Sequence, residues 1–429
     1  MNKDFDLYRI ILRAPIAPIL SPKELPNLFG CLIRTIFLTL KRLILVHDFK
    51  YPTAEGTVFM MLSSNNRRAL EPIIKQLPEN EIYSIIEPQR NFFPLTKMFL
   101  YSLFYLPSLL KHYYKAEPNK RLLFRLKYKE TFTAYGWYKI IERFYRRNPK
   151  ITTIVLANDH TLPANSIKEL AKTNGIKIIY TQHASVTSEF PPLDFDYCFL
   201  DGLESFDKYK AAGKVNSIVF ISGSPRFDEI RVFKNKRAEM ANGESRYVGV
   251  AMNALDIPEK IFDLCCYLKK FYSVIIRPHP ASKLELFNTI KEAGFEVSDS
   301  KKESPFAFLS KINCLVANES GIHLDAALME VPSFLYNFSN NKILDWYSFI
   351  KSGLIKEAST KEELVDFIRQ QIKPSVKSIK YYNAAYDTPF EGAVGGLIAN
   401  FIISLNKGYA DDFIKKTFSE IEPNTFEYK

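Results

Sequence analysis

The stretch Ser273-Val-Ile-Ile-Arg-Pro-His-Pro280 indicates the fold most directly. Its β-branched run ends abruptly in Arg277-Pro-His-Pro280, where a parallel strand would open into a loop. A companion, Cys314-Leu-Val-Ala-Asn-Glu-Ser-Gly-Ile-His323, shows a second buried-strand pattern that ends in a polar turn and begins a helix. In open α/β sheets, ligands bind at the carboxyl ends of strands, and helix N-termini bind phosphate. The two strand ends therefore predict a pocket for a nucleotide phosphate.

Strand-like and helix-like patterns alternate along the chain from Gly56 onward. Such alternation predicts βαβ units and parallel sheets. The expected strands are 57–62, 151–157, 177–181, 197–200 and 217–222 in the first half, and 247–252, 273–276, 314–317 and 333–336 in the second. We therefore expect an α/β protein with two doubly wound, Rossmann-like domains that face a cleft.

The length of 429 residues exceeds the usual size of one core, so two domains are the natural expectation. The polar and basic segment 233–246 has the composition of a linker. It separates an N-terminal domain, 1–232, from a C-terminal domain, 247–390. The remaining residues, 391–429, are expected to form C-terminal helices that could cross back to the first domain.

The formal net charge of +11 requires an anionic partner, such as nucleic acid, anionic lipid or a phosphorylated substrate. Two basic amphipathic segments, 28–46 and 94–115, are typical of helices that lie on a membrane surface. Ordinary core helices with solvated lysines would show the same pattern. Neither segment holds a clean apolar run of about 18 residues, so we expect no transmembrane span. We also expect no signal peptide, because the chain starts with Asp4 and Asp6 and lacks a short apolar core.

The motifs argue against several classes of protein. The five cysteines lack CxxC spacing, which predicts free thiols in a reducing cytoplasm. No GxxxxGK[ST] loop, GxGxxG or HExxH occurs, which argues against NTPases, nicotinamide enzymes and zinc hydrolases. Asp194-Phe-Asp196 spells a metal-binding DxD, but it precedes a strand instead of following one. We therefore expect neither a metal nor a cofactor.

The end of the strand at 273–276 supplies the first candidates for phosphate binding. Arg277 offers a bidentate fork and His279 one or two hydrogen-bond donors. Prolines on both sides of His279, including Pro280, hold this segment extended. The alternative is a structural turn in which His279 caps a carbonyl group.

Two further turns suit an anion or a nucleotide. Asn318-Glu-Ser-Gly321 fits a helix start, where Asn318 or Ser320 caps the helix and free amides face a phosphate. Glu319 could accept from ribose hydroxyls. Gly223-Ser224-Pro225-Arg226 directly follows another expected strand. The alternatives are a plain capping turn at the first site and a simple domain crossover at the second.

The first half offers candidates for a general base. Asp159 and His183 lie at the ends of two strands that are expected to be neighbours. A carboxylate or an imidazole in that position can take a proton from a hydroxyl group. The alternatives are a helix cap for Asp159 and a core histidine for His183.

Four segments in this order resemble bacterial GT-B glycosyltransferases of surface polysaccharide synthesis. They are Tyr180-Thr-Gln-His-Ala184, Gly223-Ser-Pro-Arg-Phe-Asp228, Arg277-Pro-His-Pro280, and Asn318-Glu-Ser-Gly321 with the downstream Pro332-Ser-Phe-Leu-Tyr336. The groups that share the His-Pro motif are the capsule Kdo and sialic acid transferases and the CDP-glycerol glycerophosphotransferases. The resemblance covers roughly 151 to 336.

The resemblance implies roles only at matching positions. His279 would bind the phosphate of the donor, and Glu319-Ser-Gly321 its phosphate and ribose. His183 takes the place of a proposed base in a Gln-His-Gly motif. Ala184 replaces the glycine of that motif, which puts this role in doubt. Bacterial sialyltransferases instead use a base motif of two acidic residues followed by a glycine. The corresponding segment here, Leu200-Asp201-Gly202, has only one of the two acids.

These observations together predict a metal-independent, inverting glycosyltransferase of bacterial capsule or surface polysaccharide synthesis. The donor would be a CMP-activated nonulosonic acid or Kdo, and the acceptor a glycan or a lipid-linked glycan. The alternatives are a CDP-glycerol glycerophosphotransferase, a UDP-sugar 2-epimerase of the same fold, and a non-catalytic assembly protein. We expect a cytoplasmic location with peripheral membrane contact and no nucleic-acid partner.

Overall fold

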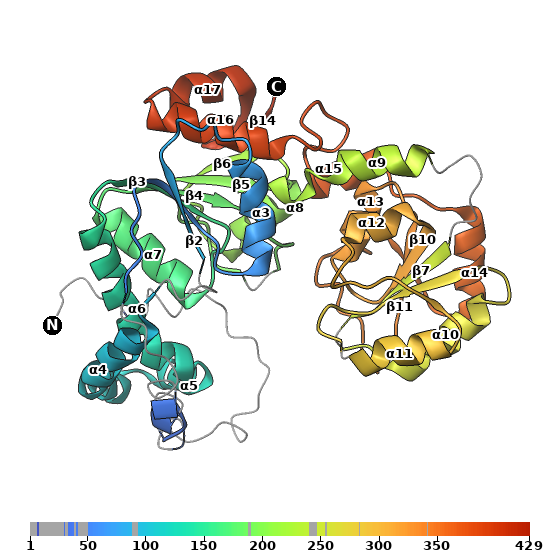
Figure 1. The fold of residues 1–429 in the computed structure, drawn as a ribbon, viewed down its shortest axis with the longest axis horizontal. Coiled ribbons are helices and arrows are strands. Elements are labelled where there is room, and N and C mark those ends of the chain that lie inside the picture. Colours follow the sequence, from blue (N-terminus) through green and yellow to red (C-terminus); the bar gives the residue numbers. More distant parts are fainter. Residues whose placement is uncertain are drawn as a thin grey trace. The chain divides into compact units, whose positions relative to one another are not determined.

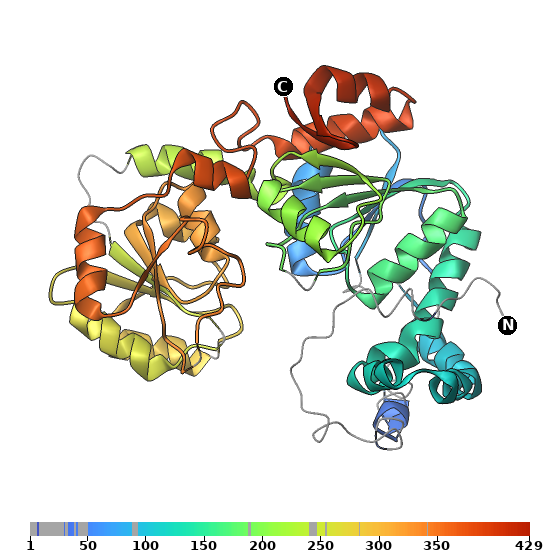
Figure 2. The same ribbon diagram turned by 180° about the vertical axis from the view of Figure 1, so that it is seen from behind.

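The computed structural model describes residues 50–87, 93–187, 190–239, 247–253, 255–282, 284–340 and 342–429, with positions 7, 30, 33–37 and 40–41. The chain divides into two compact units, drawn in Figure 1 and from behind in Figure 2. The first unit comprises Met1–Leu200, Phe206–Ile221 and Gly395–Lys429. The second comprises Asp201–Ser205 and Ser222–Val394.

The first unit is built on a sheet with the strand order β13-β14-β6-β5-β4-β3-β1-β2. Neighbouring strands pair in parallel, except that β13 and β14 form an antiparallel pair at one edge. The bounds are β1 (Gly56–Met60), β2 (Tyr83–Ile86), β3 (Ile151–Leu156), β4 (Lys177–Thr181), β5 (Tyr197–Leu200), β6 (Ile218–Ile221), β13 (Phe418–Glu422) and β14 (Thr425–Tyr428). Its central strands are continuous apolar runs because both of their faces are buried.

The helices of this unit follow the apolar periodicity of their sequences. They are α3 (Ser64–Ile74), α4 (Leu95–Lys115), α5 (Pro118–Leu126), α6 (Tyr128–Arg147), α7 (Leu162–Thr173), α8 (Leu203–Ala212, whose first residues belong to the second unit), α16 (Val394–Asn406) and α17 (Ala410–Thr417). Helices α4 and α6 approach closely at Gly136, where a Cβ atom would lie 2.1 Å from the carbonyl oxygen of Met98. Only glycine permits this crossing.

The second unit has a parallel sheet with the order β12-β11-β10-β7-β8-β9 in its described part. The bounds are β7 (Tyr247–Ala251), β8 (Val274–Arg277), β9 (Glu296–Val297), β10 (Ile312–Ala317), β11 (Ser333–Tyr336) and β12 (Lys356–Ala358). The helical segments are η2 (Pro225–Phe227), α9 (Ile230–Glu239), α10 (Pro258–Leu268), α11 (Leu284–Glu292), α12 (Pro305–Ser310), α13 (Ile322–Leu328), α14 (Lys361–Gln370) and α15 (Val376–Tyr382).

Alternate side chains of each central strand enter two separate apolar cores. On β10, Cys314 and Val316 join a core with α10 and α14, whereas Leu315 and Ala317 join one with α12 and α13. Figure 1 shows these two groups of helices on opposite faces of the sheet. This arrangement is the doubly wound pattern. The predicted α/β class with two Rossmann-like sheets is confirmed.

The structure and the sequence divide the chain at different places. Residues 233–239 of the expected linker belong to α9, and residues 240–246 lie outside the described part. Ile230 and Phe233 of α9 pack on the core of the second unit, which makes this polar segment helical despite its composition. The chain passes between units at 200/201, 205/206, 221/222 and 394/395. The final segment, Gly395–Lys429, is part of the first unit.

Candidate functional site

Each sheet has a point where the strand order reverses. In the second unit the chain runs from β7 to β8 and β9 on one side, and then returns to β10 on the other side of β7. In the first unit, β2 and β3 lie on opposite sides of β1. Loops that leave neighbouring strands in opposite directions open a crevice at their carboxyl ends, where α/β proteins bind ligands. Both crevices carry polar residues.

Hydrogen bonds tie together the loops at the crevice of the second unit. The carboxylate of Asp256, after β7, accepts from the amide of Asn253 at 2.7 Å and from the side-chain amide of Asn318, after β10, at 2.8 Å. Burial raises the pKa of Asp256, and these two hydrogen bonds and the nearby His279 oppose this shift. The predicted residues Asn318 and His279 therefore lie at one edge of one sheet, with Asp256 beside both.

His279 has the tautomer that a phosphate ligand requires. Its Nδ1 accepts a hydrogen bond from the amide of Ala281 at 3.1 Å. An accepting Nδ1 places the proton of the neutral ring on Nε2, which leaves Nε2–H as a donor. The side chain is half-buried, and the following Pro280 is exposed.

Arg277 has a structural role, which differs from the role predicted for it. Its guanidinium donates to Ser298 Oγ at 2.7 Å and to the carbonyl oxygen of Glu303 at 2.8 Å, and it lies over the ring of Phe308. The residue is the buried last member of β8. Its side chain is buried against these partners, whereas His279, two positions on, lies in the loop and is half-buried. We therefore leave Arg277 out of the proposed donor site.

The turn after β10 also makes more hydrogen bonds within the protein than the sequence predicts. Both carboxylate oxygens of Glu319 accept backbone hydrogen bonds, from Leu344 at 3.3 Å and from Trp346. Glu319 therefore anchors the segment after β11, and burial raises its pKa. Ser320 Oγ lies 3.5 Å from the amide of Ile322. A Cβ atom on Gly321 would meet nothing within 4 Å, so the space beside this residue is open.

His323, which the sequence did not indicate as a candidate, fixes this turn through two hydrogen bonds. Its Nε2 bonds to the carbonyl oxygen of Asn318 at 3.0 Å, and its Nδ1 bonds to Ser333 Oγ. The ring is completely buried, and burial lowers its pKa from 6.5 to about 4. The histidine therefore stays neutral at physiological pH and fixes the position of Asn318.

The depressed pKa of His323 predicts a loss of stability in acid. Between pH 6.5 and about 4 the unfolded chain binds a proton at this site that the folded protein does not bind. The contribution of neutral, buried His323 to the free energy of unfolding is fully present above pH 6.5. It falls by about 3 kcal/mol as the pH drops toward 4. Thermal melts of the wild type and of His323→Gln across this range should show a steeper loss in the wild type. An equal slope in both proteins would contradict this prediction. His112→Gln, in the first unit, is the control.

Arg226 forms an ion pair with the buried Asp201, and Ser224 joins this pair through a hydrogen bond. Arg226 Nη2 lies 2.8 Å from Asp201 Oδ2, and Ser224 also bonds to the carboxylate of Asp201. Burial raises the pKa of Asp201, and Arg226 opposes this shift. The guanidinium of Arg226 also lies 4.1 Å from the ring centroid of Phe227. The motif therefore links residue 201 to η2 within the second unit.

The crevice of the first unit holds a chain of hydrogen bonds that ends on an imidazole. The buried carboxylate of Asp159, after β3, contacts His160 Nδ1 at 2.7 Å through Oδ1. Its Oδ2 accepts from the hydroxyl of Tyr209 at 2.6 Å, and that hydroxyl lies 3.0 Å from the hydroxyl of Tyr180. Both oxygens of Asp159 are thus engaged. His160 is half-buried, with 34% of its side chain exposed.

His183 lies beside this pair. Strands β3 and β4 are neighbours, as the sequence predicts. The rings of His160 and His183 stack with their centroids 6.0 Å apart. The neighbouring Gln182 donates to the carbonyl oxygen of Ala184 at 2.9 Å. The structure thus brings Asp159 and His183 together and adds His160. The signal for His160 was its place directly after Asp159 at a strand end.

The remaining predicted residues divide between the two units. His183 and Asp159 belong to the first unit, and all the candidate donor-binding residues belong to the second. The acids of Asp194-Phe-Asp196 have structural partners: Lys172 pairs with Asp194, and Asp196 accepts from the amide of Ile178 at 2.8 Å.

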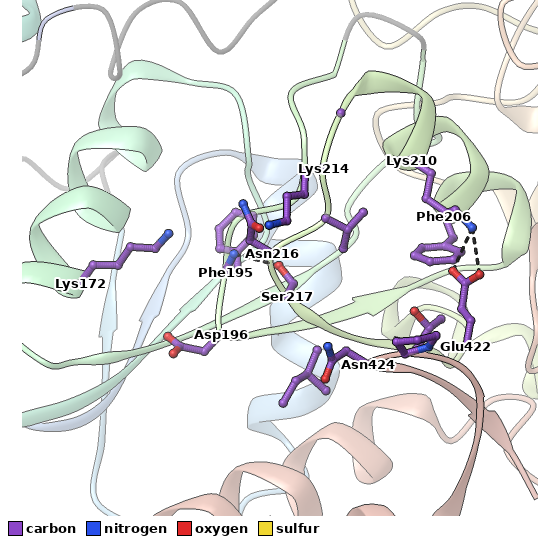
Figure 3. Close-up of a pocket in the computed structure, with 15 residues that line it drawn as sticks. Lys172, Phe195, Asp196, Phe206, Lys210, Lys214, Asn216, Ser217, Glu422 and Asn424 are labelled. Atoms are coloured by element: carbon purple, nitrogen blue, oxygen red, sulfur yellow. Dashed lines mark hydrogen bonds and ion pairs between the residues drawn. The ribbon is translucent and has the colours of Figure 1, made fainter.

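A cavity of about 840 Å³ lies at the opposite edge of the first sheet. It is lined by residues at the amino ends of β5, β6 and β14, including Asp196, Ser217 and Thr425. Figure 3 shows Lys210 and Glu422 paired across part of its wall. None of the predicted site residues lines it. Because nucleotides and catalytic groups gather at the carboxyl ends of strands, we keep two candidate sites, one at His160 in the first unit and one at His279 in the second.

No protein-family profile matches the chain, and no curated protein matches it. Solved structures do. The structure of UDP-GlcNAc 2-epimerase from Methanocaldococcus jannaschii is 14% identical, with a TM-score of 0.51 over 81% of this chain and 99% of that one. A putative UDP-N-acetylglucosamine 2-epimerase from Listeria monocytogenes is 13% identical, with a TM-score of 0.51 over 83% and 97%.

These likenesses establish a shared fold of two Rossmann-like domains, in agreement with the GT-B class predicted from the motifs. The wall teichoic acid polymerase TagF superposes with a TM-score of 0.49 at 14% identity, over 88% of this chain and 98% of that one.

Proposed function

We propose that this chain is a metal-independent, inverting glycosyltransferase of bacterial surface polysaccharide synthesis. The observation that carries the proposal is the Asp159–His160 pair, in which a buried carboxylate orients an accessible imidazole at a carboxyl strand end. This arrangement suits a general base that takes a proton from a hydroxyl group. A glycosyltransferase needs one such base for its acceptor.

The reaction that we propose is a single displacement. The acceptor hydroxyl oxygen attacks the anomeric carbon of the donor while the bond from that carbon to the phosphate oxygen breaks. His160 takes the hydroxyl proton, and Asp159 stabilises the resulting imidazolium. His183 lies next to this ring and contributes to the acceptor site. Both oxygens of Asp159 already hold hydrogen bonds, to His160 and Tyr209, so we assign Asp159 a positioning role.

His279 serves the leaving group in the second unit. Its Nε2–H donates to the phosphate that departs with the nucleotide, and such a charge-assisted bond strengthens as negative charge develops. Asn318, Ser320 and the open space at Gly321 complete the proposed donor site. A CMP-activated donor fits a site with one such histidine, because its leaving group carries a single phosphate. A nonulosonic acid or Kdo is the sugar we propose.

A UDP-sugar 2-epimerase is the second candidate. The observation that favours it is the fold shared with the epimerases, one of which was solved in complex with UDP-GlcNAc and UDP. An epimerase acts on its nucleotide sugar alone, whereas a transferase consumes it only with an acceptor.

A nucleotide screen tests the donor site. We expect CMP to raise the melting temperature of the protein more than CDP, UDP or GDP. His279→Ala should weaken CMP binding by about 10- to 100-fold, because a hydrogen bond to a charged group is lost. Arg369→Ala, at an exposed position on α14 of the second unit, is the control and should bind like the wild type. A preference for UDP would favour the epimerase. No response to any nucleotide would leave only a non-catalytic assembly protein.

A further inference from the structure

Helix α4 is part of the first unit, where one of its faces is buried and the opposite face is exposed. Its inner face is buried at Met98, Ser102, Tyr105 and Leu109 and lies against α6, near Gly136. The sequence left open whether this segment is a core helix or a membrane-surface helix. A core helix alone would carry polar residues on its outer face.

The outer face of α4 carries large apolar side chains instead. Leu100, Phe104 and Tyr114 are 37%, 81% and 66% exposed. Their spacing, together with that of Lys111, places all four within one narrow stripe of the helix. Exposed apolar groups that gather on one face, unlike scattered ones, mark an interaction surface.

Positive charge surrounds this stripe. Between Leu95 and Lys127 the sequence contains seven lysines and arginines and one acidic residue, Glu117. Helix α4 itself has no acidic residue. More than half of the net charge of +11 therefore arises within this short part of the chain.

A second stripe of the same kind occurs in the described part of the amino-terminal segment. Ile33, Phe37 and Leu40 are each at least half exposed and have the spacing of one helical face. Arg34 and Lys41 beside them are exposed as well. The pattern of α4 is thus repeated in the same unit.

We propose that the outer face of α4, formed by Leu100, Phe104, Lys111 and Tyr114, docks on an anionic lipid surface. The apolar side chains enter the boundary between headgroups and acyl chains, and the lysines meet the lipid phosphates. The positive charge around this face favours an anionic lipid surface over a second copy of the chain, because two copies would bring two basic surfaces together. No helix in the described residues is long and apolar enough to cross a membrane, so contact along one face is the geometry we infer. This inference does not depend on the proposed function.

Vesicle binding tests this inference on the full chain. We expect the wild type to sediment with vesicles of phosphatidylcholine and phosphatidylglycerol, and far less with phosphatidylcholine alone or at high salt. Lys111→Glu combined with Lys115→Glu should weaken binding at least about thirtyfold, because each lysine near an anionic surface contributes about a factor of five. Leu100→Ser combined with Phe104→Ser should also weaken binding without changing the lipid preference. Val376→Ser, at an exposed valine of the second unit, is the matched control.

Three results would overturn the inference. They are no binding to anionic vesicles, full binding by both double variants, and a wild-type dimer in solution that the Leu100 and Phe104 changes dissociate. All variants should keep the melting temperature and the nucleotide response of the wild type, because the altered side chains are exposed. A failure of vesicle binding with an intact nucleotide response would leave the proposed function standing.

Discussion

Replacing His160 by alanine is expected to lower acceptor-dependent turnover by about two to four orders of magnitude, the usual contribution of a general base. His160 is the accessible end of the hydrogen-bond chain through Asp159 and Tyr209. The measurement is nucleotide release from the donor in the presence of acceptor. Nucleotide affinity should not change, because the donor-binding residues lie in the other unit.

Asp159→Asn distinguishes positioning from direct catalysis. The amide retains the shape of the side chain but cannot stabilise the imidazolium, so turnover should fall. His183→Ala should cause a smaller loss than His160→Ala, because the carboxylate of Asp159 orients His160, whereas His183 stacks on the ring of that base. If His183→Ala abolished turnover while His160→Ala retained it, the base would be His183. His112→Ala is the control.

Replacing Arg226 by methionine should destabilise the second unit by about 3–5 kcal/mol. Asp201 is completely buried, and its ion pair with Arg226 offsets the cost of burying a carboxylate. Removing the partner leaves an uncompensated charge. The measurement is the midpoint of denaturant unfolding, followed for each transition because a two-unit chain need not unfold in one step.

The double variant Asp201→Asn with Arg226→Met should recover part of this loss, since it removes both charges. Arg231→Met is the matched control, because Arg231 is exposed on the neighbouring helix α9 and should have little effect. An unchanged midpoint in Arg226→Met would show that the ion pair is not needed for stability.

The sequence predicted the central strands well because they are continuous apolar runs buried on both faces. It missed the short strands β2, β9 and β12, and it predicted helices where β13 and β14 form an antiparallel pair. These strands are short and partly exposed, so they carry no comparable signal. It also interpreted the polar residues 233–239, which form the carboxyl-terminal part of α9, as a linker. There, a few apolar contacts decide the structure, and composition does not reveal them.

The candidate site was predictable in position but not in detail. Strand ends identified where Asp159, His183, His279 and Asn318 lie, because strand ends collect at one edge of a parallel sheet. The sequence could not show that Arg277 turns toward Ser298 or that Glu319 caps a distant loop, because such partners are set by tertiary packing.

The most direct test of the central claim is product analysis with a CMP-activated nonulosonic acid or Kdo donor, with and without a glycan acceptor. The proposal predicts acceptor-dependent release of CMP, formation of an inverted glycosidic bond, and loss of both in His160→Ala. Interconversion of a UDP-sugar with its 2-epimer in the absence of any acceptor, and no turnover of the CMP-activated donor, would contradict it.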